Sequence, residues 1–103
     1  MSNEDQIEEI EIEEYGRRGG QERHPQALRY IIRIDKTKYT VQSSHMNGRE
    51  ILELANRRPA EDYKLTQKLH GGAARTIALA QDVDFRQPGV ERFMTLKLDQ
   101  TDG

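Results

Sequence analysis

The side chains that most often carry catalysis form no reactive pattern in this sequence. The chain contains no cysteine, which excludes a thiol nucleophile, a disulfide framework and a cysteine-based zinc site. The three histidines, His24, His45 and His70, lack the spacing of metal ligands. Ser43 and Ser44 have no base pattern around them. We therefore predict that the chain is not an enzyme and that it has no catalytic residue, metal site or cofactor.

The α-carboxylate at the end of the sequence is a further group that could do chemistry. The final residues read LDQTDG, so Gly103 carries this carboxylate. A final glycine is weak support on its own, because about 7% of ordinary residues are glycine. The residues before it are poor strand and core formers, which predicts a flexible tail over residues 99–103. These residues are Asp99, Gln100, Thr101 and Asp102.

Length and composition predict one small domain that presents this tail. The 103 residues leave room for a single core, and 34% hydrophobic against 33% charged residues is a low apolar content. We therefore expect part of the chain to be unfolded. No apolar run approaches the roughly 18 residues of a membrane span, and no signal-peptide pattern opens the chain. We expect a cytoplasmic protein with no membrane partner.

Charge is distributed unevenly along the chain. Residues 1–26 hold eight acidic residues against three arginines, a balance of −5, whereas residues 27–103 carry +3. The second part is too weakly basic, and too poor in aromatic residues, to predict a nucleic-acid partner. We expect a disordered or partner-ordered acidic arm over residues 1–26 and a folded domain over residues 27–98.

Four apolar residues punctuate the acids of this arm: Ile7, Ile10, Ile12 and Tyr15. Ile10 and Ile12 alternate with glutamates as in a strand, whereas Ile7 and Ile10 also fit a helical turn. Two interpretations stay open. In one, the arm is a solvated spacer. In the other, these residues form a short peptide that adds to a partner's sheet edge or docks in a groove, with the acids steering it to a basic surface.

Two alternating apolar runs across a polar turn predict a β-hairpin at the start of the domain. Residues 28–34 place Tyr30, Ile32 and Ile34 on one face, and residues 39–42 follow the turn. The main helix is predicted next, around the stretch NGREILELA. Its first residue is a good N-cap, and the glutamate three positions later completes a capping box.

Further strands are predicted at residues 63–69, around Ile77 and over residues 91–98. A hairpin, a helix and then two or three strands is the order of a β-grasp. A right-handed crossover through the helix places the last strand parallel to the first, near the sheet centre. We therefore predict an α+β fold: a ubiquitin-like β-grasp with a mixed sheet of four to five strands, one main helix and a flexible acidic N-terminal arm.

The stretch from Arg29 to Gly103 resembles the bacterial multiubiquitin-domain family. The matching pieces are, in order, YIIRIDKTKYTV, GREILELA, PAEDYKLTQKLHGG and QPGVERFMTLKLDQTDG. GREILELA and PGVERF are the more specific of them, and together the pieces cover about three quarters of the chain. Members of this family are encoded beside ubiquitin-activating-like and conjugating-like enzymes, some of them in antiphage islands.

The resemblance implies a protein modifier of a bacterial, antiphage-type ubiquitination-like pathway. Its partners would be a ThiF-like, ubiquitin-activating-like enzyme with ATP, a ubiquitin-conjugating-like enzyme, a deconjugating protease and a target protein. The carboxylate of Gly103 would be adenylated, passed through an ester or thioester and joined to an amine. Glycine suits this role because it has no Cβ to hinder approach to the acyl carbon. The activating enzyme would read the tail, namely Asp99, Gln100, Thr101 and Asp102.

The sequence departs from ubiquitin in this tail. Asp102 stands where ubiquitin has the first glycine of its Gly-Gly ending, and the tail is acidic rather than basic. The enzyme channel that accepts it should therefore be neutral or positive. Two alternatives to a modifier stay open: a β-grasp module that binds without forming a covalent bond, and a sulfur carrier that forms a thiocarboxylate on the same glycine.

A partner-binding surface is expected on the sheet face away from the helix. Ile31 lies on that face in the predicted alternation, beside Arg33 and with Lys68 on a neighbouring strand. An exposed isoleucine among basic residues would suit contact with a conjugating enzyme, although one apolar side chain does not make a patch.

Overall fold

The computed structural model describes residues 7–18 and 24–98 of the chain. Its helices and strands, in order, are β1 (Ile7–Glu11), α1 (Ile12–Arg17), β2 (Ala27–Ile34), β3 (Thr37–Val41), β4 (His45–Asn47), α2 (Gly48–Leu54), the 3-10 helix η1 (Ala60–Asp62), β5 (Tyr63–Leu69), β6 (Ala74–Ile77), β7 (Asp82–Asp84) and β8 (Val90–Lys97). The predicted tail, residues 99–103, lies outside the described residues.

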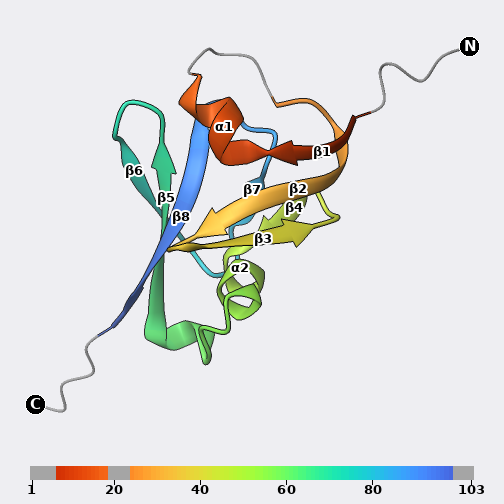
Figure 1. The fold of residues 1–103 in the computed structure, drawn as a ribbon. Helices are drawn as coiled ribbons and strands as arrows, with labels where there is room; N and C mark the ends of the chain where they lie inside the picture. The colour runs from red at the N-terminus through yellow and green to blue at the C-terminus, as the bar shows by residue number, and fades with distance from the viewer. Residues whose placement is uncertain (1–6, 19–23, 99–103) are drawn as a thin grey trace, which may run out of the picture.

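The main sheet is mixed, with β8 at its centre (Figure 1). β8 runs antiparallel to β5 and parallel to β2, which it meets where Ile34 pairs with Phe93. β3 pairs antiparallel with β2, and β6 pairs antiparallel with β5. A hairpin, a crossing helix and a last strand parallel to the first confirm the predicted α+β, ubiquitin-like β-grasp. The sheet has six strands rather than four to five, because β1 joins it.

The core lies between the sheet and α2. Tyr30, Ile32 and Ile34 are all buried, as the alternation of β2 predicts. The ring of Phe85, from the stretch after β7, lies 6.2 Å from that of Tyr30 and 6.1 Å from that of Phe93, measured between centroids. These three aromatic rings fill the centre of the core because each is shielded completely from solvent.

The start of α2 follows directly from its sequence. Asn47 is the N-cap: its side-chain oxygen accepts a hydrogen bond from the backbone N–H of Glu50, and the Glu50 carboxylate accepts one from Asn47 N. The predicted capping box is therefore confirmed. The helix turns Ile51 and Leu52 into the core. It ends at Leu54, earlier than the run of apolar and basic residues suggests.

The N-terminal acidic arm is where the structure departs from the sequence prediction. Residues 7–18, called the N-terminal segment below, form β1 and α1 and pack against the sheet of their own chain (Figure 1). β1 pairs in parallel with β2, from Ile7 beside Ala27 to Glu11 beside Ile31. The prediction of a disordered or partner-ordered arm is thus wrong for residues 7–18. This segment adds a strand to the sheet of its own chain rather than to the sheet of a partner.

Burial and charge pairing explain why this segment folds. Ile10 and Ile12 are 2% and 0% exposed, so both isoleucines belong to the core, and Ile7 and Tyr15 pack against it. The repulsion expected among the glutamates is offset by basic residues that lie far away in sequence. Lys38 contacts Glu11, and Arg33 contacts Glu13. Residues 1–6 and 19–23 of the predicted arm lie outside the described residues.

A second, two-stranded sheet formed by β4 and β7 lies beside the main one. Its strands are only three residues long, and the sequence pattern did not reveal them. Pairing of Met46 with Val83 holds the entry to α2 against the connector before β8. Val83 and Phe85 are both buried, so the connector before β8 contributes to the core.

Candidate functional site at the end of the last strand

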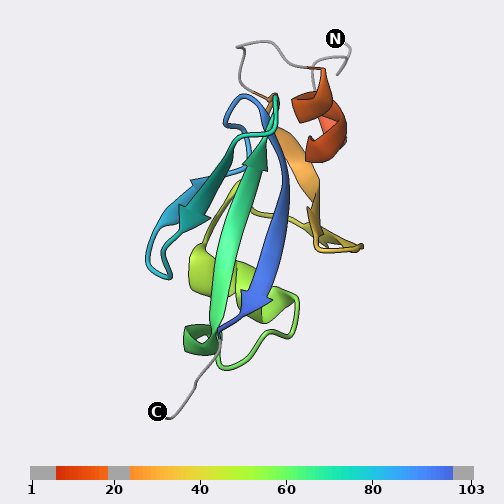
Figure 2. The same ribbon diagram turned by 90° about the vertical axis from the view of Figure 1, so that its left-hand side faces the viewer.

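The end of β8 determines where the C-terminal tail leaves the domain. Lys97 is paired across the sheet with Tyr63, and the next residue, Leu98, donates its backbone N–H to the carbonyl oxygen of Asp62 at 2.8 Å. The strand is therefore held until the last residue that the structure describes. Figure 2 shows this exit at the same end of the molecule as η1, whereas α1 lies toward the other end.

A compact polar cluster fixes β8 shortly before this exit. The carboxylate of Asp35, in the β2–β3 turn, accepts hydrogen bonds from Thr95 N at 2.8 Å and from Thr95 Oγ1 at 2.6 Å. Arg57, just after α2, donates to Asp35 Oδ2 at 3.0 Å and to Thr95 Oγ1 at 3.1 Å. The backbone N–H of Asp35 also donates to the carbonyl of Phe93. We call Asp35, Arg57 and Thr95 the exit cluster.

The backbone of Asp35 is adapted to this role. Its φ is +56°, in the left-handed region that aspartate and asparagine tolerate better than most residues. Burial acts to raise the pKa of its carboxyl group, but the hydrogen bonds from Thr95 and Arg57 outweigh burial and lower the pKa below its ordinary value. Asp35 therefore carries a negative charge that ties the hairpin turn, the end of α2 and the last strand together.

The predicted tail residues are not tested by this geometry. Gly103, Asp99, Gln100, Thr101 and Asp102 all lie beyond Leu98, outside the described residues. Their proposed roles in conjugation and in recognition by an activating enzyme stay predictions. What the structure adds is the anchored strand that precedes them.

The predicted partner-binding residues lie on one face of the sheet but in different surroundings. Ile31 is half-buried, with Glu11 of β1 as its strand neighbour, and Arg33 binds the carboxylate of Glu13 at 3.2 Å. Lys68 lies on β5, across β8 from β2, where its Nζ is 3.6 Å from Glu91. The N-terminal segment thus occupies part of the face that sequence reasoning assumed to be open.

An open apolar position on the same face escaped the sequence analysis. Leu96 is 63% exposed and stands opposite Lys64 on β5. Leu98, at the exit, is also exposed. The signal was available in the last strand: Phe93 points into the core, so the alternation places Met94 and Leu96 on the opposite face. Leu96 and Leu98 are thus two exposed apolar side chains close to the point where the tail begins.

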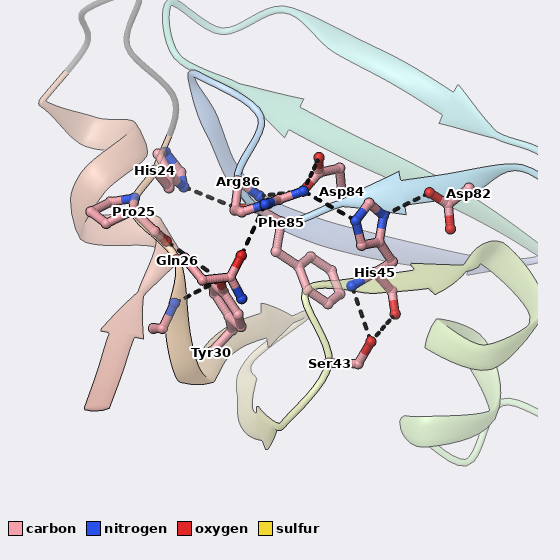
Figure 3. A network of polar contacts seen from close by, with 11 residues as sticks. His24, Pro25, Gln26, Tyr30, Ser43, His45, Asp82, Asp84, Phe85 and Arg86 are labelled. Atoms are coloured by element: carbon pink, nitrogen blue, oxygen red, sulfur yellow. Dashed lines mark hydrogen bonds and ion pairs between the residues drawn. The ribbon is translucent and has the colours of Figure 1, made fainter. Parts of the chain in front are cut away.

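Figure 3 shows a polar network that links β4 and β7 to the start of β2. Asp82 Oδ2 lies 2.9 Å from His45 Nδ1, and Arg86 contacts His45 Nε2, Asp84 and the side chain of Gln26. Arginine nitrogens only donate, so His45 Nε2 is the acceptor and Nδ1 carries the proton toward Asp82. The hydrogen bond to Asp84, together with the charge of that carboxylate, raises the pKa of Arg86.

This network does not have the geometry of a nucleophile and a base. The hydroxyl of Ser43 donates to the backbone carbonyl of His45 at 2.6 Å and accepts from its backbone N–H at 3.1 Å, so it engages the main chain rather than the imidazole ring. Across residues 7–18 and 24–98, no three histidine or acidic side chains gather as metal ligands. The described helices also include none long and apolar enough to cross a membrane.

His24 joins the N-terminal segment to this part of the molecule. Its Nδ1 lies 3.0 Å from the carbonyl oxygen of Phe85 (Figure 3). Its ring centroid is 5.6 Å from that of Tyr15 in α1. Nε2 is buried with no hydrogen-bond partner among the described residues. Burial lowers the pKa of His24, against the opposing effects of the Phe85 carbonyl and the Asp84 charge. The imidazole is therefore neutral in the folded protein near pH 7.

Comparison with known proteins agrees with this architecture. A sequence model of the family described as multiubiquitin matches residues 30–97, a stretch that begins within β2 and ends with the last residue of β8. No curated protein matches the chain. No solved structure matches it either. Because the matched stretch is more than half of the chain and contains the hairpin, the crossing helix and the central last strand, the chain belongs to the multiubiquitin family.

Proposed function

We propose that this protein is a ubiquitin-like modifier that is joined to a target through the carboxylate of Gly103. The observation that carries the proposal is the match to the multiubiquitin family. The match ends at Lys97, the last residue of the anchored strand β8, and the tail follows it in the sequence. Supporting it, the exit cluster holds β8 up to this point, and Leu96 offers an exposed apolar contact beside it. The setting we propose is a cytoplasmic, bacterial ubiquitination-like pathway of the antiphage type.

The chemistry is supplied by partner enzymes. A ThiF-like, ubiquitin-activating-like enzyme would let the Gly103 carboxylate attack the α-phosphate of ATP, which releases pyrophosphate and forms an acyl adenylate. A nucleophile of the enzyme would displace AMP to give an ester or thioester, and a conjugating-like enzyme would pass the acyl group to an amine of the target as an amide or isopeptide bond. A deconjugating protease would hydrolyse that bond. This chain contributes the carboxylate and the docking surface.

Incubation of the protein with an activating-like enzyme encoded beside it and with ATP tests the proposal. Intact-mass measurement should show an adenylate or an enzyme-linked ester at Gly103. Deletion of Gly103 should abolish transfer while the melting temperature stays unchanged, because the tail follows the last strand of the fold. Full transfer by the truncated chain would disprove conjugation through this glycine.

A non-covalent binding module is the alternative that a specific observation favours. The exposed Leu96 opposite Lys64 can serve a partner without any bond at the tail. Under this alternative, Leu96→Ser would weaken partner binding, whereas deletion of Gly103 would leave binding unchanged. A sulfur carrier would instead show replacement of one carboxylate oxygen by sulfur in the same mass measurement.

A further inference from the structure

Among the described residues, the N-terminal segment alone occupies one edge position of the main sheet. Tyr30 and Ile31 of β2 each pair with β3 on one side and with β1 on the other. β8 lies on the same side of β2 as β1, but it pairs with β2 only where Ile34 meets Phe93. Within the described part of the chain, the stretch 27–31 therefore depends on β1 to satisfy the backbone groups of its second edge.

The fit between the segment and this position is specific in shape. Ile10 and Ile12 are buried in the core. Gly16 of α1 lies so close to β8 that a Cβ built on it would be 2.1 Å from the carbonyl oxygen of Val90. The surface therefore accepts a strand that buries Ile10, followed by a helix that buries Ile12 and has glycine at the contact with Val90.

The fit is also specific in charge. The Glu13 side chain is 6% exposed, and Arg33 binds its carboxylate at 3.2 Å. Lys38 pairs with Glu11, and Arg29 lies 3.5 Å from Glu9. Basic side chains of β2 and β3 thus face acids of the segment. We call the 27–31 edge together with Arg33, Lys38 and Val90 the segment-binding surface.

We propose that the segment-binding surface also accepts the N-terminal segment of a second copy of this chain, so that two molecules exchange their segments. The contacts that bury Ile10, Ile12 and Glu13 are made with the domain beyond the segment, and a second copy offers the same contacts. Exchange therefore keeps these contacts of the described residues, and concentration decides the balance. A tethered segment competes at an effective concentration in the millimolar range, so exchange becomes substantial as the protein approaches about 1 mM.

Disulfide trapping in the full-length chain tests this proposal. The chain has no cysteine, so Glu9→Cys and Arg29→Cys each introduce a unique thiol. Glu9 and Arg29 are strand partners with side chains in contact, which suits a disulfide. The two single variants are unfolded together in urea, refolded as a mixture and then oxidised. One sample is refolded at about 1 mM, near the effective concentration of the tethered segment, and the other at a concentration a thousandfold lower. A double variant in one chain, refolded at the lower concentration, verifies the geometry by forming an internal disulfide.

The expected result is a several-fold excess of the mixed disulfide over the two symmetric ones at the higher concentration, identified by intact mass, and its loss at the lower one. The matched control pairs Arg29→Cys with Glu14→Cys, a position on α1 whose side chain is 54% exposed. This control should give only collisional cross-links. Two results together would overturn the proposal. The mixed disulfide would be no more abundant for Glu9→Cys with Arg29→Cys than for Glu14→Cys with Arg29→Cys, and the wild-type chain would be monomeric by light scattering at about 1 mM.

Discussion

Asp35 illustrates how one residue connects segments that are distant in sequence. Its carboxylate accepts three hydrogen bonds, two from Thr95 and one from Arg57. Asp35→Asn removes the negative charge and places an amide NH₂ group where the carboxylate accepted hydrogen bonds from Thr95 and Arg57. We therefore expect the free energy of unfolding to fall by about 1–3 kcal/mol in urea denaturation. Asp82→Asn is the control, because the Asp82 side chain is 65% exposed and its replacement should change stability little. Equal effects of the two changes would contradict the role of the exit cluster.

The same variant gives a signature in pH. The pKa of Asp35 is lowered in the folded protein, so its contribution is present above the ordinary value of 3.8 and is lost as the pH falls through the folded pKa. Asp35→Asn should therefore flatten the loss of stability below about pH 4. Denaturant midpoints at pH 7, 4 and 3 measure this; an unchanged acid slope would show that other carboxylates dominate.

His24 predicts a pH effect nearer neutrality. Because burial lowers its pKa, the unfolded chain takes up a proton below about pH 6.5 while the folded chain resists it. Stability should therefore decrease as the pH falls from 7.5 to 5.5. His24→Gln, which keeps a donor for the Phe85 carbonyl, should reduce this dependence in urea titrations. His70→Gln, at a side chain that is 51% exposed, is the control and should leave most of the slope in place.

At the scale of elements, the contact between α1 and β8 depends on Gly16. Gly16→Ala places a methyl group against the carbonyl of Val90, so α1 must move away from the strand. We expect a loss of about 1–3 kcal/mol and faster amide exchange in β1 and in residues 27–31. Glu14→Ala, at an exposed position of the same helix, should leave both quantities nearly unchanged. Undisturbed exchange in Gly16→Ala would mean that α1 accommodates the methyl group.

Sequence reasoning succeeded for elements whose signals are local. The alternation of Tyr30, Ile32 and Ile34, and the Asn47–Glu50 capping box, are set by neighbouring residues, and both are confirmed. It failed for β1 and α1 because their stability comes from partners far along the chain. Read alone, the run of glutamates indicates repulsion; Arg33 and Lys38, which offset it, lie on β2 and β3, about twenty residues or more further along the chain.

At the scale of the whole molecule, the N-terminal segment protects a sheet edge. Removal of residues 1–18 exposes the second edge of β2 and the apolar surface under Ile10 and Ile12. We expect the truncated chain to be less stable and to associate as its concentration rises, because open edges pair with other chains. Light scattering of the truncated and full-length chains compares the two. Removal of residues 1–6 alone, which precede β1, is the control and should have no such effect.

The candidate site was only partly accessible from sequence for a similar reason. The resemblance directs attention to Gly103, and local alternation placed Ile31 and Arg33 on the outer face. Neither signal shows that the N-terminal segment shares that face, nor that Asp35 in a turn holds the last strand sixty residues later. Such contacts depend on tertiary packing, which a local pattern does not contain.

The arrangement of the chain's two described ends has a practical consequence. Figure 1 shows β1, where the described chain begins, well away from the end of β8, where it leaves. A fluorophore or affinity tag attached upstream of Ile7 would therefore sit away from the region that an acyl-transfer enzyme must reach.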